Sequence, residues 1–294
     1  MGKTREIKKR IKAVGNIRRI TNTMRMIATS KFARAQQKAT ATKPYTEGVF
    51  ELVRNIAATS GGGGEITHPL IAGVPGAANA RELTLVVTSD RGLCGPYNGS
   101  ILRAAMVHLR GNASAKNGII ELVGRKGAAF LKFNNVAVSE LHALGDKPEF
   151  ATIEKIAQSY MDRFASGQIS KVNVIYMRYI SAGRQRPEVM QLLPLKPPTD
   201  TAQSTKAKSV DYEFSPKAEI LLSALLPAAV KATLYQAFND AIVSEHIARM
   251  IAMKSATDNA GKMGKALTRQ YNRARQAQIT TELTEIISGA AALE

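Results

Sequence analysis

The stretch Ser89–Asn98, SDRGLCGPYN, holds the residue types best suited to chemistry, including Cys94, the one cysteine of the chain. A nucleophilic cysteine needs a base that removes its proton. The four histidines, at positions 68, 108, 142 and 246, stand far apart and form no paired metal or protease motif. We therefore expect Cys94 to be a small buried residue, with Gly92 and Gly95 permitting a tight strand-to-helix turn. A cysteine enzyme is the lesser alternative, which retained activity in Cys94→Ser would exclude.

Phosphate-binding loops need glycines at defined spacings, and this sequence does not supply them. Gly92, Gly95 and Gly99 match neither the dinucleotide fingerprint nor the P-loop, and the GRKG segment at 124–127 also fails. A single cysteine allows no internal disulfide and no thiolate zinc site. We expect no catalytic residue, no cofactor and no metal site in this chain.

The middle of the chain has the pattern that would position such a turn. Strands alternate with amphipathic helices, which predicts an α/β domain with a mostly parallel sheet. The final two strands are joined too closely for a crossover and should form a hairpin. The expected strands are 83–88, 118–123, 135–139, 172–180 and 189–195, and the expected helices are 98–110, 126–132 and 152–165.

Both ends of the chain repeat apolar residues at spacings of three and four, from Lys3 to Thr59 and from Lys217 to Ser288. Single prolines, Pro44 and Pro227, interrupt the two patterns. Two long striped helices around a compact domain predict an antiparallel coiled coil. The expected domains are an N-terminal helix at 1–60, a glycine-rich linker at 61–80, the α/β domain at 81–200, a connector at 201–216 and a C-terminal helix at 217–294.

The charge is strongly basic, with a formal net charge of +18, and it gathers at the two ends. Residues 1–43 contain thirteen basic residues and one acid, and residues 249–275 contain seven and one. Such an excess indicates an acidic partner: nucleic acid, an anionic membrane or an acidic protein surface. No aromatic residues interleave with the basic ones as in nucleic-acid modules. An acidic protein partner is favoured, and a basic coiled-coil nucleic-acid binder is the alternative.

Membrane insertion and export are not expected from the sequence. No apolar run approaches the roughly 20 residues that span a bilayer, and the charged start lacks the apolar region of a signal peptide. The C-terminal stretch 279–294, ITTELTEIISGAAALE, is unusual for a free helix end, since it would expose several large apolar side chains to water.

Three separated blocks resemble a known family, and the resemblance extends from end to end. They are IKKRIKAVGNIRRITNTMRMIATSKFARAQ from Ile7, the SDRGLCGPYN turn, and SEHIARMIAMKSATDNAGKM from Ser244 with its continuation from Tyr271. The chain is similar to the gamma subunits of F-type ATP synthases. The resemblance implies a Rossmann-like middle domain, with the terminal helices as the coiled coil.

By this resemblance the chain is a central rotor stalk without catalytic residues of its own. It would turn inside a hexamer of alpha and beta subunits, coupling proton or sodium flow to ATP synthesis or hydrolysis on beta. Further implied partners are an epsilon-type subunit and the membrane ring of c subunits, with no nucleic acid. The implied location is peripheral, on the cytoplasmic face of a bacterial plasma membrane.

The resemblance also assigns site residues, matched position by position to this sequence. The implied contacts with the alpha–beta hexamer are Met24, Arg249, Arg273, Arg275, Gln276, Thr280, Glu282 and Glu285. The implied apolar bearing tip consists of Ile279, Leu283, Ile286, Ile287 and Leu293. The implied contacts with the membrane ring are Lys31, Lys38, Asp211 and Tyr212.

Overall fold

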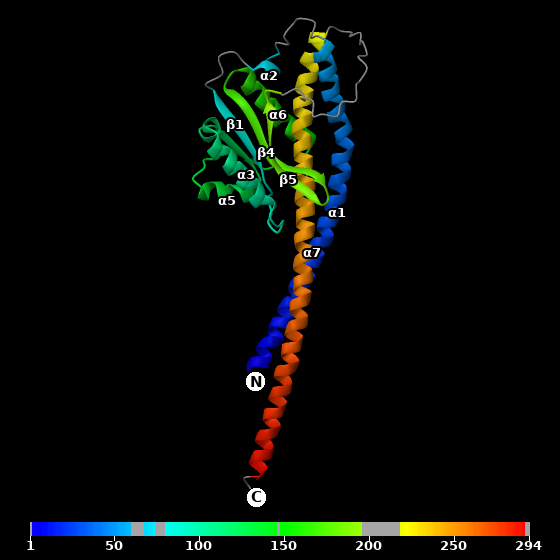
Figure 1. The fold of residues 1–294 in the computed structure, drawn as a ribbon, viewed down its shortest axis with the longest axis vertical. Helices are drawn as coiled ribbons and strands as arrows, with labels where there is room; N and C mark the ends of the chain where they lie inside the picture. The colour runs from blue at the N-terminus through cyan, green and yellow to red at the C-terminus, as the bar shows by residue number, and fades with distance from the viewer. Residues whose placement is uncertain (1, 60–67, 74–79, 146–147, 196–217, 292–294) are drawn as a thin grey trace. The chain divides into compact units, whose positions relative to one another are not determined.

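A computed structural model describes residues 2–59, 68–73, 80–145, 148–195 and 218–291 (Figure 1). The chain divides into two compact units, which we call the helix-pair unit (Met1–Ser30 with Arg249–Glu294) and the sheet unit (Lys31–Ala248). The elements are α1 Gly2–Thr59, α2 Pro69–Ala72, β1 Arg81–Val87, α3 Tyr97–Gly111, α4 Ala113–Lys116, β2 Ile119–Val123, α5 Arg125–Phe133, β3 Glu140–His142, α6 Phe150–Ala165, β4 Ile169–Ser181, β5 Arg184–Leu193 and α7 Ala218–Ala291.

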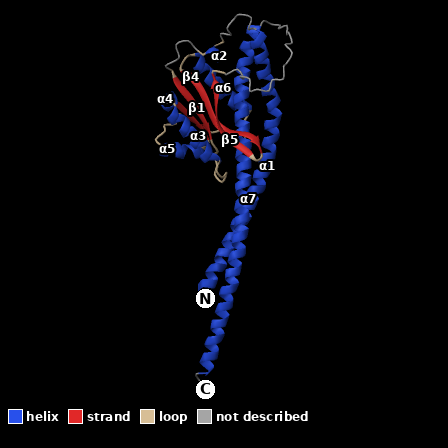
Figure 2. Ribbon diagram, in the orientation of Figure 1, coloured by secondary structure: helices blue, strands red, loops and turns tan. Residues whose placement is uncertain are grey.

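The sheet unit is built on five strands in the order β3-β2-β1-β4-β5 (Figure 2). The pairs β1–β2, β1–β4 and β2–β3 are parallel, with Leu83 opposite Ile119 and Val172. The β4–β5 pair is antiparallel, which confirms the predicted hairpin. The alternation of strand and helix in the sequence explains this order, since a parallel neighbour requires a crossover that a helix supplies.

Alternate side chains of β1, β2 and β4 enter two different cores, as the pleat of a strand requires. Leu83, Leu85 and Val87 pack with buried residues of α6 and α7 and with Val49 of α1. Val86, between them, packs on the other face with α3, α4 and α5. The sheet therefore lies between two helical layers, and the prediction of an α/β fold is confirmed.

The two long helices run antiparallel in each unit. In the helix-pair unit, Thr4 of α1 hydrogen-bonds to Gln278 of α7, and Thr257 of α7 donates a hydrogen bond to Thr21 of α1. Residue numbers on α7 therefore decrease where those on α1 increase. In the sheet unit, Thr42 of α1 donates to Gln236 of α7 at 2.9 Å. Pro44 and Pro227 both lie inside continuous helices, so neither proline ends a helix.

Two expectations need correction, apart from the fifth strand, which was expected at 189–195 and is Arg184–Leu193. The third strand was expected at 135–139, but β3 is Glu140–His142. Asn135 adopts a left-handed backbone with φ 56°, and the amide of Val136 still bonds to the carbonyl of Leu131. These contacts close α5, so pairing with β2 begins later than the apolar residues suggest.

The second correction concerns apolar length. Helix α7 contains an 18-residue window with a mean hydropathy of 1.4, long and apolar enough by composition to cross a membrane. Within the structure, 44% of this window is buried. Leu226, Val230 and Leu234 of α7 are part of the core of the sheet unit.

Candidate functional site

The turn at Ser89–Asn98 joins β1 to α3 and encloses Cys94, which is 2% exposed. Asn98 donates to the Cys94 Sγ at 3.3 Å, and the Ser89 Oγ lies 3.7 Å from it. No histidine is among the polar partners of Cys94 in the described part of the chain. The thiol is thus held by an amide and a hydroxyl, as expected for a buried turn residue.

The tight turn was attributed to Gly92 and Gly95. Gly95 does adopt a positive φ, of 56°, but the second residue in the left-handed region is Leu93, with φ 65°, and not Gly92. Leu93 is 59% exposed, so the turn directs an apolar side chain outward. A left-handed leucine breaks the usual preference for glycine or asparagine, so no sequence pattern predicts it.

In the helix-pair unit, a narrow seam holds α1 and α7 together. Val14, Ala28, Met253 and Ala260 are buried along it. Gly264 of α7 faces Val14 of α1 across it: a Cβ added at Gly264 would meet a methyl of Val14 at 3.9 Å, an ordinary van der Waals contact. The seam occupies little of the helix surface, so most of the basic residues lie at the surface.

The residues expected to contact a hexamer are largely on this surface. Met24 is 38% exposed, Arg249 is half-buried and Arg273, Arg275 and Gln276 are exposed. Arg273 and Arg275 make no ion pair with any described residue. Further along, the exposed Glu282 accepts a hydrogen bond from Gln278 at 2.8 Å, Thr280 donates to its own helix and Glu285 is exposed.

The expected bearing tip extends past the start of α1. Thr4, near the first residue of α1, pairs with Gln278, so α7 has no described helical partner beyond that level. Every described side chain from 281 to 289 is exposed. Large apolar side chains are among them and just before them: Ile279 is 51% exposed, Leu283 57%, Ile286 69% and Ile287 60%. Leu293 lies outside the described residues.

The expected ring contacts are only partly described, because Asp211 and Tyr212 lie outside the described residues. Lys31 and Lys38 belong to the sheet unit and line one pocket together with Arg34 and His246. Sequence reasoning missed Arg34 and His246. Arg34 could have been identified from its spacing to Lys31 and Lys38 along one helix face. No local pattern could have identified His246, which comes from α7.

A buried charged cluster in the sheet unit also escaped prediction. Glu121 of β2 lies 2.8 Å from the His142 Nε2, and it accepts hydrogen bonds from Tyr160 at 2.6 Å and Arg163 at 2.8 Å. Burial alone would raise the pKa of Glu121, but these three hydrogen bonds outweigh it and lower that pKa. The hydrogen bond to Glu121 in turn raises the pKa of His142 against the effect of burial.

Glu121, Glu140 and His142 are close enough to hold a metal ion, with their ligand atoms within 4.8 Å of one another. However, the His142 Nε2 and both oxygens of Glu121 already take part in the hydrogen bonds described above. The arrangement of these side chains is that of an ion-pair network whose hydrogen bonds are already made.

Comparison with solved structures shows where this fold occurs. A chain from the mitochondrial ATP synthase of Euglena gracilis, in a structure of its OSCP, F1 and c-ring, aligns with a TM-score of 0.64 at 17% identity. The alignment covers 99% of this chain and 95% of that one. A chain of the central stalk and c-ring structure from Tetrahymena thermophila aligns with a TM-score of 0.57 at 21% identity, over 81% of this chain and 99% of that one.

Comparison of sequences gives a closer relationship. Residues 3–293 match the family model described as ATP synthase. The ATP synthase gamma chain of Rhodopirellula baltica is 40% identical over 300 residues, and that of an Exiguobacterium strain is 40% identical over 296 residues. Each of these alignments covers 100% of both chains. The chain belongs to the ATP synthase gamma chain family.

Proposed function

We propose that this chain is the central rotor stalk of an F-type ATP synthase, turning inside a hexamer of alpha and beta subunits. Rotation would couple proton or sodium flow through a membrane ring of c subunits to ATP synthesis or hydrolysis. The full-length match to gamma chains supports this role. The observation that carries it is the protruding end of α7, where Ile279, Leu283 and Ile286 are more than half exposed.

An apolar helix end of this kind requires a partner, because exposing large apolar side chains to water is unfavourable. We propose that 279–293 turns in an apolar bearing formed by the hexamer. The basic surface beside it, with Arg273 and Arg275, would face acidic segments of the beta subunits. Met24, Arg249, Gln276, Thr280, Glu282 and Glu285 are proposed contacts on the same helices.

The coupling follows from asymmetry. A helix pair inside a ring of repeated subunits presents a different face to each one, so each beta subunit experiences different contacts at a given angle. Differential contacts of this kind shift a conformational equilibrium. Catalysis would then occur on beta, with this chain as a non-catalytic subunit.

The proposed site of action is the cytoplasmic face of a bacterial plasma membrane. The sheet unit would bind an epsilon-type subunit and the c ring, with Lys31, Lys38, Asp211 and Tyr212 toward the ring. The alternative of a nucleic-acid binder is not supported, because the sequence matches are to ATP synthase gamma chains.

Charge reversal at Arg275 tests the proposal. Arg275 is exposed and without an ion pair among the described residues, so Arg275→Glu should change the free energy of unfolding by less than about 0.5 kcal/mol. The variant should nevertheless lower ATPase activity and proton pumping of the reconstituted complex, because its partner surface is acidic. Thermal unfolding of the chain and pumping by the complex are the two measurements.

The matched control is Lys155→Glu, a charge reversal at another exposed residue, on α6. It should leave pumping unchanged. Equal losses of stability and pumping in Arg275→Glu, or equal pumping losses in the two variants, would contradict the proposed contact.

A further inference from the structure

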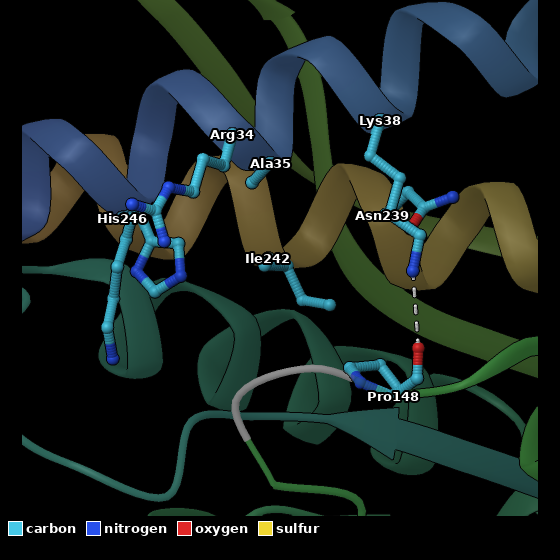
Figure 3. A pocket seen from close by; sticks show the side chains of 8 residues that line it. Arg34, Ala35, Lys38, Pro148, Asn239, Ile242 and His246 are labelled. Atoms are coloured by element: carbon cyan, nitrogen blue, oxygen red, sulfur yellow. Dashed lines mark hydrogen bonds between the residues drawn. The ribbon is translucent and has the colours of Figure 1, made fainter.

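A pocket of about 350 Å³ lies in the sheet unit between α1, α7 and the segment that leads into α6. This volume is at the lower end of the range for small-molecule sites, roughly 300–1,000 Å³. Figure 3 shows Arg34 and His246 toward one end, Lys38 and Pro148 toward the other, and Ile242 between them. All the lining residues belong to one compact unit, so the pocket is a feature of that unit alone.

The pocket has a strongly cationic rim. Lys31, Arg34 and Lys38 follow one another at spacings of three and four, which places their side chains on one face of α1. None of the described lining residues is acidic. Like charges at these spacings repel, so the rim favours an anion.

Arg34 has hydrogen-bond donors that no described residue uses. The guanidinium of Arg34 is exposed and makes no hydrogen bond or ion pair with any residue in the described ranges. Lys38 is oriented differently: its Nζ donates to the Pro148 carbonyl at 3.5 Å and lies 5.1 Å from the centre of the Tyr235 ring. The unpaired guanidinium of Arg34 suits an oxyanion, since guanidinium binds phosphate through two parallel donors.

The interior of the pocket is different from its rim. Ala35 and Ile242 are half-buried and supply apolar surface. Asn239 and His246 are 3% and 4% exposed and form the deeper wall. An inorganic ion would use only the rim, whereas an anion with an apolar substituent would cover the interior as well.

We propose that this pocket binds an organic phosphate, with the phosphate on Arg34 at one end of the pocket and an apolar substituent against Ala35 and Ile242. A phosphate monoester carries a charge of about −1.5 to −2 near neutral pH, which matches several cations better than a carboxylate does. The phosphate could belong to a membrane lipid or to a soluble metabolite. This inference goes beyond the proposed rotor function and does not depend on it.

Octyl phosphate is a suitable probe, titrated below its micelle concentration into the full-length chain in a calorimeter. The expected result is saturable binding with one site per chain. Arg34→Gln should weaken binding by about tenfold or more, because it removes a charge-assisted hydrogen bond. Lys38→Gln, at the other end of the pocket, should weaken binding less. Ile242→Ala should weaken the binding of octyl phosphate several-fold and leave the weaker binding of inorganic phosphate unchanged.

Lys43→Gln is the matched control, since Lys43 is an exposed lysine of α1 outside the pocket. It should bind octyl phosphate as the unaltered chain does. Equal weakening in Lys43→Gln and Arg34→Gln would overturn the inference, because it would indicate attraction by net charge alone. Absence of saturable binding, or octanol binding as well as octyl phosphate, would also overturn it.

Vesicles identify the source of the phosphate. If the natural ligand is a lipid, vesicles that contain phosphatidic acid should bind the unaltered chain but not the Arg34→Gln variant. Phosphatidylcholine vesicles should bind neither protein. If it is a soluble metabolite, octyl phosphate should bind while both kinds of vesicle leave the chain in solution. Retention of the chain and Arg34→Gln alike on phosphatidic acid would contradict the assigned pocket.

Discussion

Glu121 keeps its charge inside the sheet unit because three donors from two other elements, β3 and α6, surround it. Its side chain is 2% exposed and that of His142 is 11% exposed. Burying an ion in this way is costly unless its hydrogen bonds are complete, and removing one partner leaves the charge uncompensated. At the residue scale, His142, Tyr160 and Arg163 therefore act together to fix β2, β3 and α6 around one carboxylate.

His142→Ala should make this linkage visible as a pH dependence. The folded-state pKa of His142 is raised above its ordinary value of 6.5. Its contribution to stability is therefore complete below that value and is lost as pH rises through the folded-state pKa. The variant should lose about 1–3 kcal/mol near pH 5.5 and less at alkaline pH. Urea unfolding at both pH values is the measurement.

His68→Ala provides a control of opposite sign. Burial lowers the pKa of His68, and its Nδ1 accepts a hydrogen bond from the Leu70 amide at the start of α2. Its contribution is therefore present above the ordinary value of 6.5 and is lost as pH falls. If the His142→Ala and His68→Ala effects shift with pH in the same direction, the assignment of the Glu121 network is wrong.

At the element scale, two helical glycines differ in how closely their surroundings pack against them. Helix α5 begins directly after β2 and lies against the sheet at Gly127. A Cβ added there would lie 2.7 Å from a methyl of Leu122 and 2.8 Å from the Thr88 hydroxyl. The Gly127 amide also donates to that hydroxyl at 3.1 Å. In the helix-pair unit, by contrast, Gly264 faces only ordinary contacts.

Alanine should consequently have opposite effects at these two glycines. Gly127→Ala should destabilise the chain by about 1–3 kcal/mol, because overpacking displaces the sheet or the helix. Gly264→Ala should be neutral or should stabilise by up to about 1 kcal/mol, since glycine is a poor residue for a helix interior. Denaturant unfolding of the two variants measures both; destabilisation by Gly264→Ala would show that the helices need closer contact there.

The elements were largely predictable from the sequence, because period and breakers are local properties. The striped pattern of the ends predicted the bounds of α1 and α7 to within three residues. The alternating middle predicted three of the five strands to within three residues, whereas β5 begins five residues before its expected start. The third strand was misplaced because its boundary depends on pairing with β2. The Glu121 network and the Lys31–Arg34–His246 pocket could not be predicted, since their residues meet only through the fold.

At the scale of the whole molecule, the two units divide the requirements of a rotor. The sheet unit buries two cores and a charged network, which gives a stable body for attachment. The helix-pair unit buries a narrow seam and leaves basic and apolar side chains at its surface. This distribution of burial favours a chain whose helix-pair unit works in contact with other subunits.

Rotation itself tests the central claim most directly. Cys94 is 2% exposed, whereas Val107 on α3 is 73% exposed, so Val107→Cys provides one reactive thiol for attaching a bead. The complex is assembled with immobilised alpha and beta subunits and observed under a microscope with ATP present. The account predicts stepwise rotation of the bead in one direction, stopped by removing ATP. A bead that stays still while the same complexes hydrolyse ATP would contradict the account.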